Sequence, residues 1–150
     1  MAELTRQDVI KLVAAAHSKP IRLRGVDLSG LDLSCLDLSF VDFSYANLKE
    51  VDLSGATLNR SAFFGANLIG ANLSQATLKY ADLISADLTN ANLSQADLEQ
   101  ATLCDVTLAG ANLAQARFEG ACFDGIQTNS ATIWPEGFNK QQHVLFQKTD

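Results

Sequence analysis

The chain has 150 residues, a hydrophobic fraction of 47% and a formal net charge of −6, which suits a single soluble domain. No apolar run approaches the roughly 20 residues of a membrane span, and the N-terminus lacks the basic start, apolar run and cleavage site of a secretory signal. Because 17 acidic residues outweigh 11 basic ones, the basic patch of an ordinary nucleic-acid binder is absent, and we expect a cytoplasmic protein that contacts neither membrane nor nucleic acid directly.

Residues 1–20 are predicted to form an N-terminal helical cap. Thr5 and Asp8 have the spacing of a capping-box variant, which marks the start of a helix. The apolar residues that follow recur at helical spacing: Val9, Leu12, Val13 and Ala16. Pro20 ends the helix.

Residues 21–125 form 21 consecutive units of five residues without an insertion. The third position of every unit is Leu or Phe, and the first is Ala in 13 units. An α-helix cannot use this pattern, because five residues advance the apolar position by about 140° and spread the leucines around the circumference. A flat strand fails as well, because its side chains alternate with period two and an odd repeat would place successive leucines on opposite faces.

The pattern becomes consistent if each unit is a three-residue extended stretch followed by a two-residue corner. The first and third positions then point inward and the second points outward. If each corner turns about a right angle, four units close one coil of 20 residues, and residue n lies beside residue n+20. Successive coils would pair as parallel strands about 4.8 Å apart. The sequence therefore predicts an all-β quadrilateral helix with a core of Leu and Phe.

Residues 126–150 are predicted to contain degenerate repeats and a C-terminal cap or tail. The five-residue register decays through IQTNS and ATIWP. Trp134 and Phe138 then provide bulky side chains that can lie over the last coil, as the ends of stacked repeats require. The structure of residues 140–150 is left open.

The repeat resembles the pentapeptide repeat family, whose unit A(D/N)LXX occurs here as ANLIG, ANLSQ, ADLIS and ADLTN. The resemblance covers residues 21–125 and implies a right-handed quadrilateral parallel β-helix. The ATIWPEGF segment resembles the repeat terminus of bacterial, particularly cyanobacterial, members, most of which have no established biochemical activity. A minority of members are dimeric acidic rods that mimic DNA and regulate type II topoisomerases. The departures from the pattern are mild: Ser61, Ala62, Phe63 and Arg117.

No catalytic, cofactor-binding or metal site is predicted. His17 and His143 are the only histidines and lie outside the repeat, at opposite ends of the expected rod, so they cannot share a site. The aspartates recur at the second position because the repeat recurs. The glycines fall at corners, where a left-handed backbone is convenient, and form no phosphate-binding loop.

The three cysteines are expected to be free thiols facing outward. Cys35, Cys104 and Cys122 match no zinc-binding spacing. Cys104 and Cys122 share a wall on adjacent coils, but the ideal register places their Cα atoms roughly 8 Å apart. This separation exceeds the ~7 Å limit for a disulfide.

Residues 20 apart form columns along the predicted rod, and the charges in these columns show whether the surface resembles the anionic backbone of DNA. The repeat holds 13 acidic and 6 basic residues, but none of the four second-position columns is acidic throughout. A mimic needs a continuous anionic track. The sequence therefore favours a solvated acidic surface that keeps the rod soluble.

One wall of the predicted rod carries a run of outward apolar side chains. Its fourth-position column contains Phe64, Ile84 and Cys104, and aromatic residues stand at both neighbouring corners. We call this surface the aromatic wall and define it by six residues: Phe40, Tyr45, Phe64, Tyr80, Ile84 and Cys104. A contiguous apolar patch indicates a contact surface, so we expect a protein partner of unknown identity, or a second subunit, to dock there.

The leading interpretation is a non-enzymatic β-solenoid that acts as a scaffold or protein-interaction module, as a monomer or a homodimer. The alternative is an acidic DNA mimic that regulates a type II topoisomerase. Neither interpretation requires a cofactor.

Overall fold

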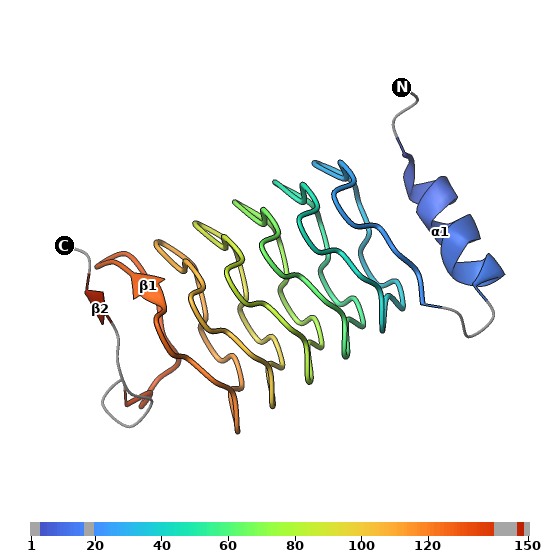
Figure 1. The fold of residues 1–150 in the computed structure, drawn as a ribbon. Coiled ribbons are helices and arrows are strands. Elements are labelled where there is room, and N and C mark those ends of the chain that lie inside the picture. Colours follow the sequence, from blue (N-terminus) through green and yellow to red (C-terminus); the bar gives the residue numbers. More distant parts are fainter. Residues whose placement is uncertain (1–3, 17–19, 140–146, 149–150) are drawn as a thin grey trace.

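In the computed structural model, which describes residues 4–16, 20–139 and 147–148, the chain winds into a rod of stacked four-sided coils (Figure 1). Helix α1 (Arg6–Ala15) lies at the N-terminal end of the rod, and strands β1 (Gln127–Thr128) and β2 (Gln147–Lys148) lie at the other end. The predicted β-solenoid with one short N-terminal helix is confirmed.

The coils stack with the predicted register of 20 residues. The second residues of successive units form parallel bridges, from Arg22 with Asp42 through to Thr107 with Gln127. Leu73, for example, donates its amide hydrogen to the Asn92 carbonyl at 2.7 Å. Each wall is therefore a narrow parallel sheet, and residues 20 apart lie side by side along the rod.

Each unit buries its third residue and turns at its fourth and fifth residues. Beyond the first coil, nearly every unit also buries its first residue. Leu73 and Ala76 are fully buried, and the turn between them is closed by a hydrogen bond of 3.1 Å from the Ala76 amide to the Leu73 carbonyl. Gln75, the second corner residue, has a φ of 58°. A positive φ at that position is what a type II turn requires. The predicted glycine corners share it, as at Gly65 with a φ of 61°.

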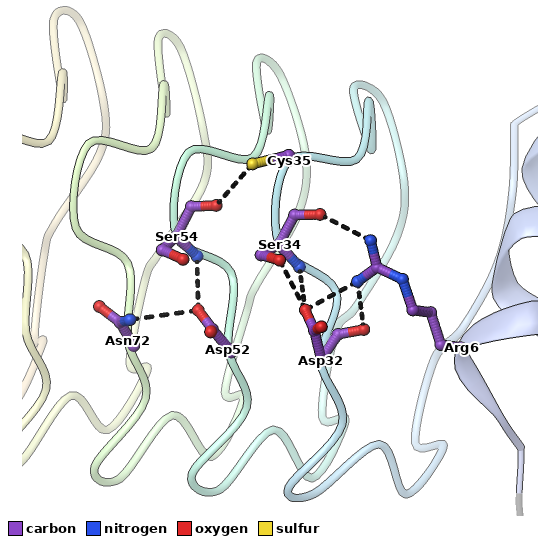
Figure 2. Close-up of polar contacts among 7 residues, drawn as sticks. All are labelled: Arg6, Asp32, Ser34, Cys35, Asp52, Ser54 and Asn72. Atoms are coloured by element: carbon purple, nitrogen blue, oxygen red, sulfur yellow. Dashed lines mark hydrogen bonds and ion pairs between the residues drawn. The ribbon is translucent and has the colours of Figure 1, made fainter.

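The second position is Asp or Asn in most units for a reason that the repeat pattern alone does not reveal. The Asp52 carboxylate accepts a hydrogen bond of 2.9 Å from the Ser54 amide, which closes an Asx turn at the corner. Asn72, 20 residues later, donates its side-chain amide to the same carboxylate at 3.1 Å (Figure 2). An acidic or amide side chain thus stabilises both its own corner and the stacking of coils.

Helix α1 begins as predicted and contacts the first coil along a narrow face. Thr5 and Asp8 form the capping box, and Val9 is fully buried while Val13 is partly buried against the core. The prediction that Leu12 shares this apolar stripe is wrong, because 42% of Leu12 is exposed. Leu12 is offset from Val13 by about 100° around the helix axis, at the edge of the buried face, where much of its side chain is open to solvent.

Arg6 of α1 closes the open edge of the first coils. Carbonyl groups on a wall normally accept hydrogen bonds from the preceding coil, and no coil precedes Asp32 and Ser34. The Arg6 guanidinium donates to the Asp32 carbonyl at 2.5 Å and to the Ser34 carbonyl at 3.0 Å, and it pairs with the Asp32 carboxylate at 2.7 Å (Figure 2). The helix therefore satisfies groups that would otherwise offer a template for edge-to-edge association.

We expect Arg6→Ala to destabilise the rod and to promote association through this edge. Hydrogen bonds from a charged donor contribute about 1–3 kcal/mol, which corresponds to a fall of roughly 3–10 °C in melting temperature for a chain of this size. Thermal unfolding and sedimentation velocity measure the two effects. Lys11→Ala removes the same charge from an exposed helix position, and equal behaviour of the two variants would contradict the role given to Arg6.

Aromatic side chains gather at the C-terminal end of the rod. The Trp134 and Phe138 rings stack with centroids 4.6 Å apart, and Phe138 lies 5.7 Å from Phe118 of the last coils. The register shifts by one residue here: Asn112 pairs with Ile133, whereas the 20-residue register would pair it with Thr132.

The open prediction for residues 140–150 is resolved only in part. Gln147 and Lys148 form β2, which pairs in parallel with β1 and keeps the 20-residue register. Residues 140–146 and 149–150 lie outside the described part of the chain, as do His17 and His143. Within the described residues, no helix is long and apolar enough to cross a membrane.

Candidate interaction site

The structure places the predicted column of the aromatic wall on one face of the rod. The Tyr45 amide donates to the Phe64 carbonyl at 2.9 Å, and Gly65 and Ser85 continue the same ladder to Ile84 and Cys104. Phe40, Tyr45 and Tyr80 are 62%, 51% and 53% exposed, and Phe64 is 36% exposed. Ile84 and Cys104 are half-buried. The large rings therefore remain accessible to a partner.

Both tyrosines of the chain are exposed, and neighbouring side chains hold each of them. The Tyr45 ring packs edge-on against Phe64 with centroids 5.4 Å apart, and the Arg24 guanidinium lies 4.7 Å from its centroid on the other side. The Arg60 guanidinium lies 5.3 Å from the centroid of Tyr80. These contacts order the rings before any partner binds, which lowers the entropy cost of association.

The corner position explains how large rings can stay exposed. Phe40, Tyr45 and Tyr80 are fifth residues of their units and have φ values of 63°, 59° and 59°. Such values are uncommon for bulky residues, but every corner of the solenoid imposes them. Gly65 occupies the same corner as Tyr45 in the next coil, 20 residues on. A Cβ atom at Gly65 would lie 3.0 Å from the Tyr45 ring. The glycine thus leaves room for the ring.

The N-terminal part of the aromatic wall is locally basic, although the chain as a whole is acidic. Arg22 and Arg24 belong to the first unit of this wall and face Asp42 of the next coil. Hydrogen bonds from Ser44, aided by the two arginines, hold the pKa of Asp42 below its usual value. Arg24 was not among the predicted site residues, but the 20-residue column that runs through positions 24, 44 and 64 identifies it.

Acidic side chains elsewhere on the rod are interrupted by amides and cations. On another wall, Lys79 pairs with Glu99 at 2.6 Å and with Asp97 at 3.3 Å, and Arg117 pairs with Asp97 at 3.0 Å. Asn47 donates to Asp27 in the same way as Asn72 donates to Asp52. The confirmed register therefore keeps the predicted columns, none of which is acidic throughout.

The cysteine prediction needs a correction. Cys35, Cys104 and Cys122 are free, as expected, but the distance argument against pairing Cys104 with Cys122 is wrong. Their Sγ atoms lie 2.8 Å apart, because the side chains lean toward each other across adjacent coils, which an estimate from ideal Cα positions does not capture. The Asp124 carboxylate joins them, with all three potential ligand atoms within 4.8 Å of one another.

Comparison with known proteins matches this architecture. A family model described as pentapeptide repeats matches residues 21–60, 58–95 and 86–126. A pentapeptide repeat protein from the cyanobacterium Cyanothece 51142 is 27% identical with a TM-score of 0.66, over 84% of this chain and 99% of its own. A pentapeptide repeat protein of the Arabidopsis thaliana thylakoid lumen is 34% identical with a TM-score of 0.53, over 79% of this chain and 72% of its own.

A third structure is similar in fold alone. QnrB1, a plasmid-mediated fluoroquinolone resistance protein, is 18% identical with a TM-score of 0.65, over 87% of this chain and 83% of its own. No curated protein has a significantly similar sequence.

Proposed function

The chain belongs to the pentapeptide repeat family, and on this basis we propose that it is a rigid interaction module that binds another protein through the aromatic wall. Pentapeptide repeat proteins are generally non-catalytic scaffolds. The observation that carries the proposal is the cluster of exposed rings on one wall of the rod, where neighbouring side chains hold two of them in place.

The composition of the wall supports a protein partner. Aromatic residues and arginine are enriched at protein interfaces and supply most of their energetic hot spots. Arg24 and Arg60 stack on Tyr45 and Tyr80 at the two corners, and their guanidinium groups can still pair with carboxylates. The partner surface that fits is therefore apolar at its centre, opposite Phe64, and acidic at its rim.

The rod supports this role mechanically. Every coil is hydrogen-bonded to the next, and the buried third-position leucines form one continuous core. Stacked repeats offer extended binding surfaces that change little on binding. A partner therefore meets side chains that are already positioned, and the binding free energy is not spent on ordering the backbone.

The alternative, a DNA mimic that regulates a type II topoisomerase, has weaker support. The acidic columns carry Asn ladders and the cluster of Lys79 and Arg117 with Asp97, and the arginines of the aromatic wall oppose an anionic track. The similarity to QnrB1 concerns the fold. A gyrase supercoiling assay separates the two proposals. If the wild-type chain inhibits or protects gyrase, and variants of the aromatic wall do so equally well, DNA mimicry is favoured.

We expect the double variant Phe64→Ser, Ile84→Ser to bind the partner at least tenfold more weakly than the wild type. Truncating a hot-spot residue costs about 2 kcal/mol or more, and both side chains face outward, so the rod should stay folded. Affinity capture from the native cell, followed by titration of the purified captured protein, measures the change. Ile69→Ser, which removes a half-buried isoleucine at the same position of a different wall, is the matched control.

A partner that is retained by wild type and Ile69→Ser but lost from the double variant supports the proposal. Unchanged capture by a double variant with a wild-type melting temperature overturns it. A concentration-dependent dimer that the double variant abolishes would also overturn it, since the wall would then bind a second copy of the chain.

A further inference from the structure

The structure holds a pair of thiols at the edge of the aromatic wall, and the proposed function does not use their redox chemistry. Cys104 is the fourth residue of its unit, and Cys122 is the second residue of the unit stacked on it, beside Thr102. The two Sγ atoms are 2.8 Å apart, closer than two sulfur atoms in ordinary contact, and both side chains are half-buried. Cys35, by contrast, is exposed, and its thiol donates to the Ser54 carbonyl at 3.8 Å.

The groups around the sulfurs fit a covalent bond better than a shared metal ion. Two thiolates on a tetrahedral zinc ion, each about 2.3 Å from the metal, are about 3.8 Å apart, and a disulfide requires about 2.05 Å. The separation of 2.8 Å lies between these values, so the ligand set decides. Among the residues that the structure describes, Asp124 offers the one further ligand within reach, and its carboxylate is exposed. A closed structural zinc site needs four protein ligands.

We propose that Cys104 and Cys122 form a redox-active dithiol that low-molecular-weight disulfides, such as oxidised glutathione, convert to a disulfide joining two adjacent coils. The Cys122 thiolate attacks one sulfur of the oxidant, breaks its S–S bond and releases one thiolate. Cys104 then gives its proton to solvent and attacks the Cys122 sulfur, releasing the second thiolate. The protein loses two electrons and two protons, and one oxidant molecule becomes two thiols.

The surroundings set the order of the two attacks. Burial and the neighbouring Cys122 thiol raise the pKa of Cys104 to about 11. Because the thiolate is the nucleophile in thiol–disulfide exchange, the raised pKa makes Cys104 the weaker first nucleophile. Cys104 reacts second, when the sulfur that it attacks is already held beside it.

The disulfide would covalently link two adjacent coils at the C-terminal end of the stack, where the last coil has few neighbours. The two residues are 18 positions apart, and closing a loop of about that length favours the native state over the unfolded chain by roughly a hundredfold. The melting temperature should rise by about 5–10 °C on oxidation. Cys104 belongs to the aromatic wall, but the test of this inference needs no partner, because the disulfide forms within the chain alone.

The test equilibrates the full-length protein with oxidised and reduced glutathione, alkylates the remaining thiols and digests with trypsin. Cleavage after Lys79, Arg117 and Lys140 places Cys104 and Cys122 on different peptides, so the bond appears as a cross-linked peptide pair. We expect this pair in wild type and in Cys35→Ser, and its loss in Cys104→Ser and Cys122→Ser. In denaturant, the equilibrium constant for forming this disulfide from the dithiol should be about a hundredfold smaller.

Two results would overturn the proposal. One is that Cys104 and Cys122 give only separate glutathione adducts, as the isolated Cys35 should. The other is that the cross-linked pair forms equally in native and denatured protein, because the fold would then contribute nothing to the pairing.

Discussion

Leu73→Lys is expected to abolish the folded rod at 25 °C. Leu73 is fully buried at the centre of the stack, and the substitution loses about 2 kcal/mol of apolar burial. It also places an unpaired ammonium group among leucines, which costs several kcal/mol more. Domains of this size are stable by about 5–15 kcal/mol, so most or all of the stability disappears.

Circular dichroism and thermal unfolding measure this loss. Gln75→Lys introduces the same charge two residues away, at an exposed corner of the same unit, and should change stability by no more than about 0.5 kcal/mol. A Leu73→Lys protein that unfolds at the wild-type temperature would mean that the third position does not face a dry core.

Phe63→Ala should be the next most damaging change. Phe63 and Phe43 are fully buried and stack face to face with centroids 5.1 Å apart. Removing the ring leaves a cavity in a core that hydrogen bonds hold on all four walls, so little collapse can fill it. Substitutions of this kind cost about 3–5 kcal/mol, or a fall of roughly 6–20 °C in melting temperature.

Phe63→Leu provides the matched control, because Leu occupies the third position of most units and should cost less than about 1.5 kcal/mol. Ser61, two residues earlier, stays satisfied in both variants through its hydrogen bond of 2.6 Å to the Leu58 carbonyl. Chemical denaturation separates the two variants, and equal loss from both would contradict tight packing around the ring.

The five-residue period predicts most of the fold because several constraints coincide. Only a chain that turns every five residues can bury the third residue of every unit, such as Leu73 and Leu78, on one side of the backbone, and this geometry fixes the 20-residue register. Columns at that spacing then identify which residues are neighbours along a wall. The aromatic wall was predictable for this reason, from Phe64, Ile84 and the corner rings.

Features that depend on the direction of a side chain were not predictable in this way. Arg6 reaches the Ser34 carbonyl across 28 positions, and no periodic pattern relates the helix to the coil. Leu12 and Val13 are both apolar, and the sequence does not show which face of the short helix packs against the first coil. The meeting of Cys104 and Cys122 results from side chains that lean diagonally, which a register of Cα positions does not contain.

The measurement that tests the central claim most directly is site-specific photocrosslinking in the native cell. A photoreactive benzoylphenylalanine replaces Phe64 on the aromatic wall in one strain and Ile69 on a different wall in another. We predict a discrete cross-linked protein from position 64 and none from position 69. An equal yield from both positions, or no adduct from position 64, would contradict the proposal that the aromatic wall binds a protein partner.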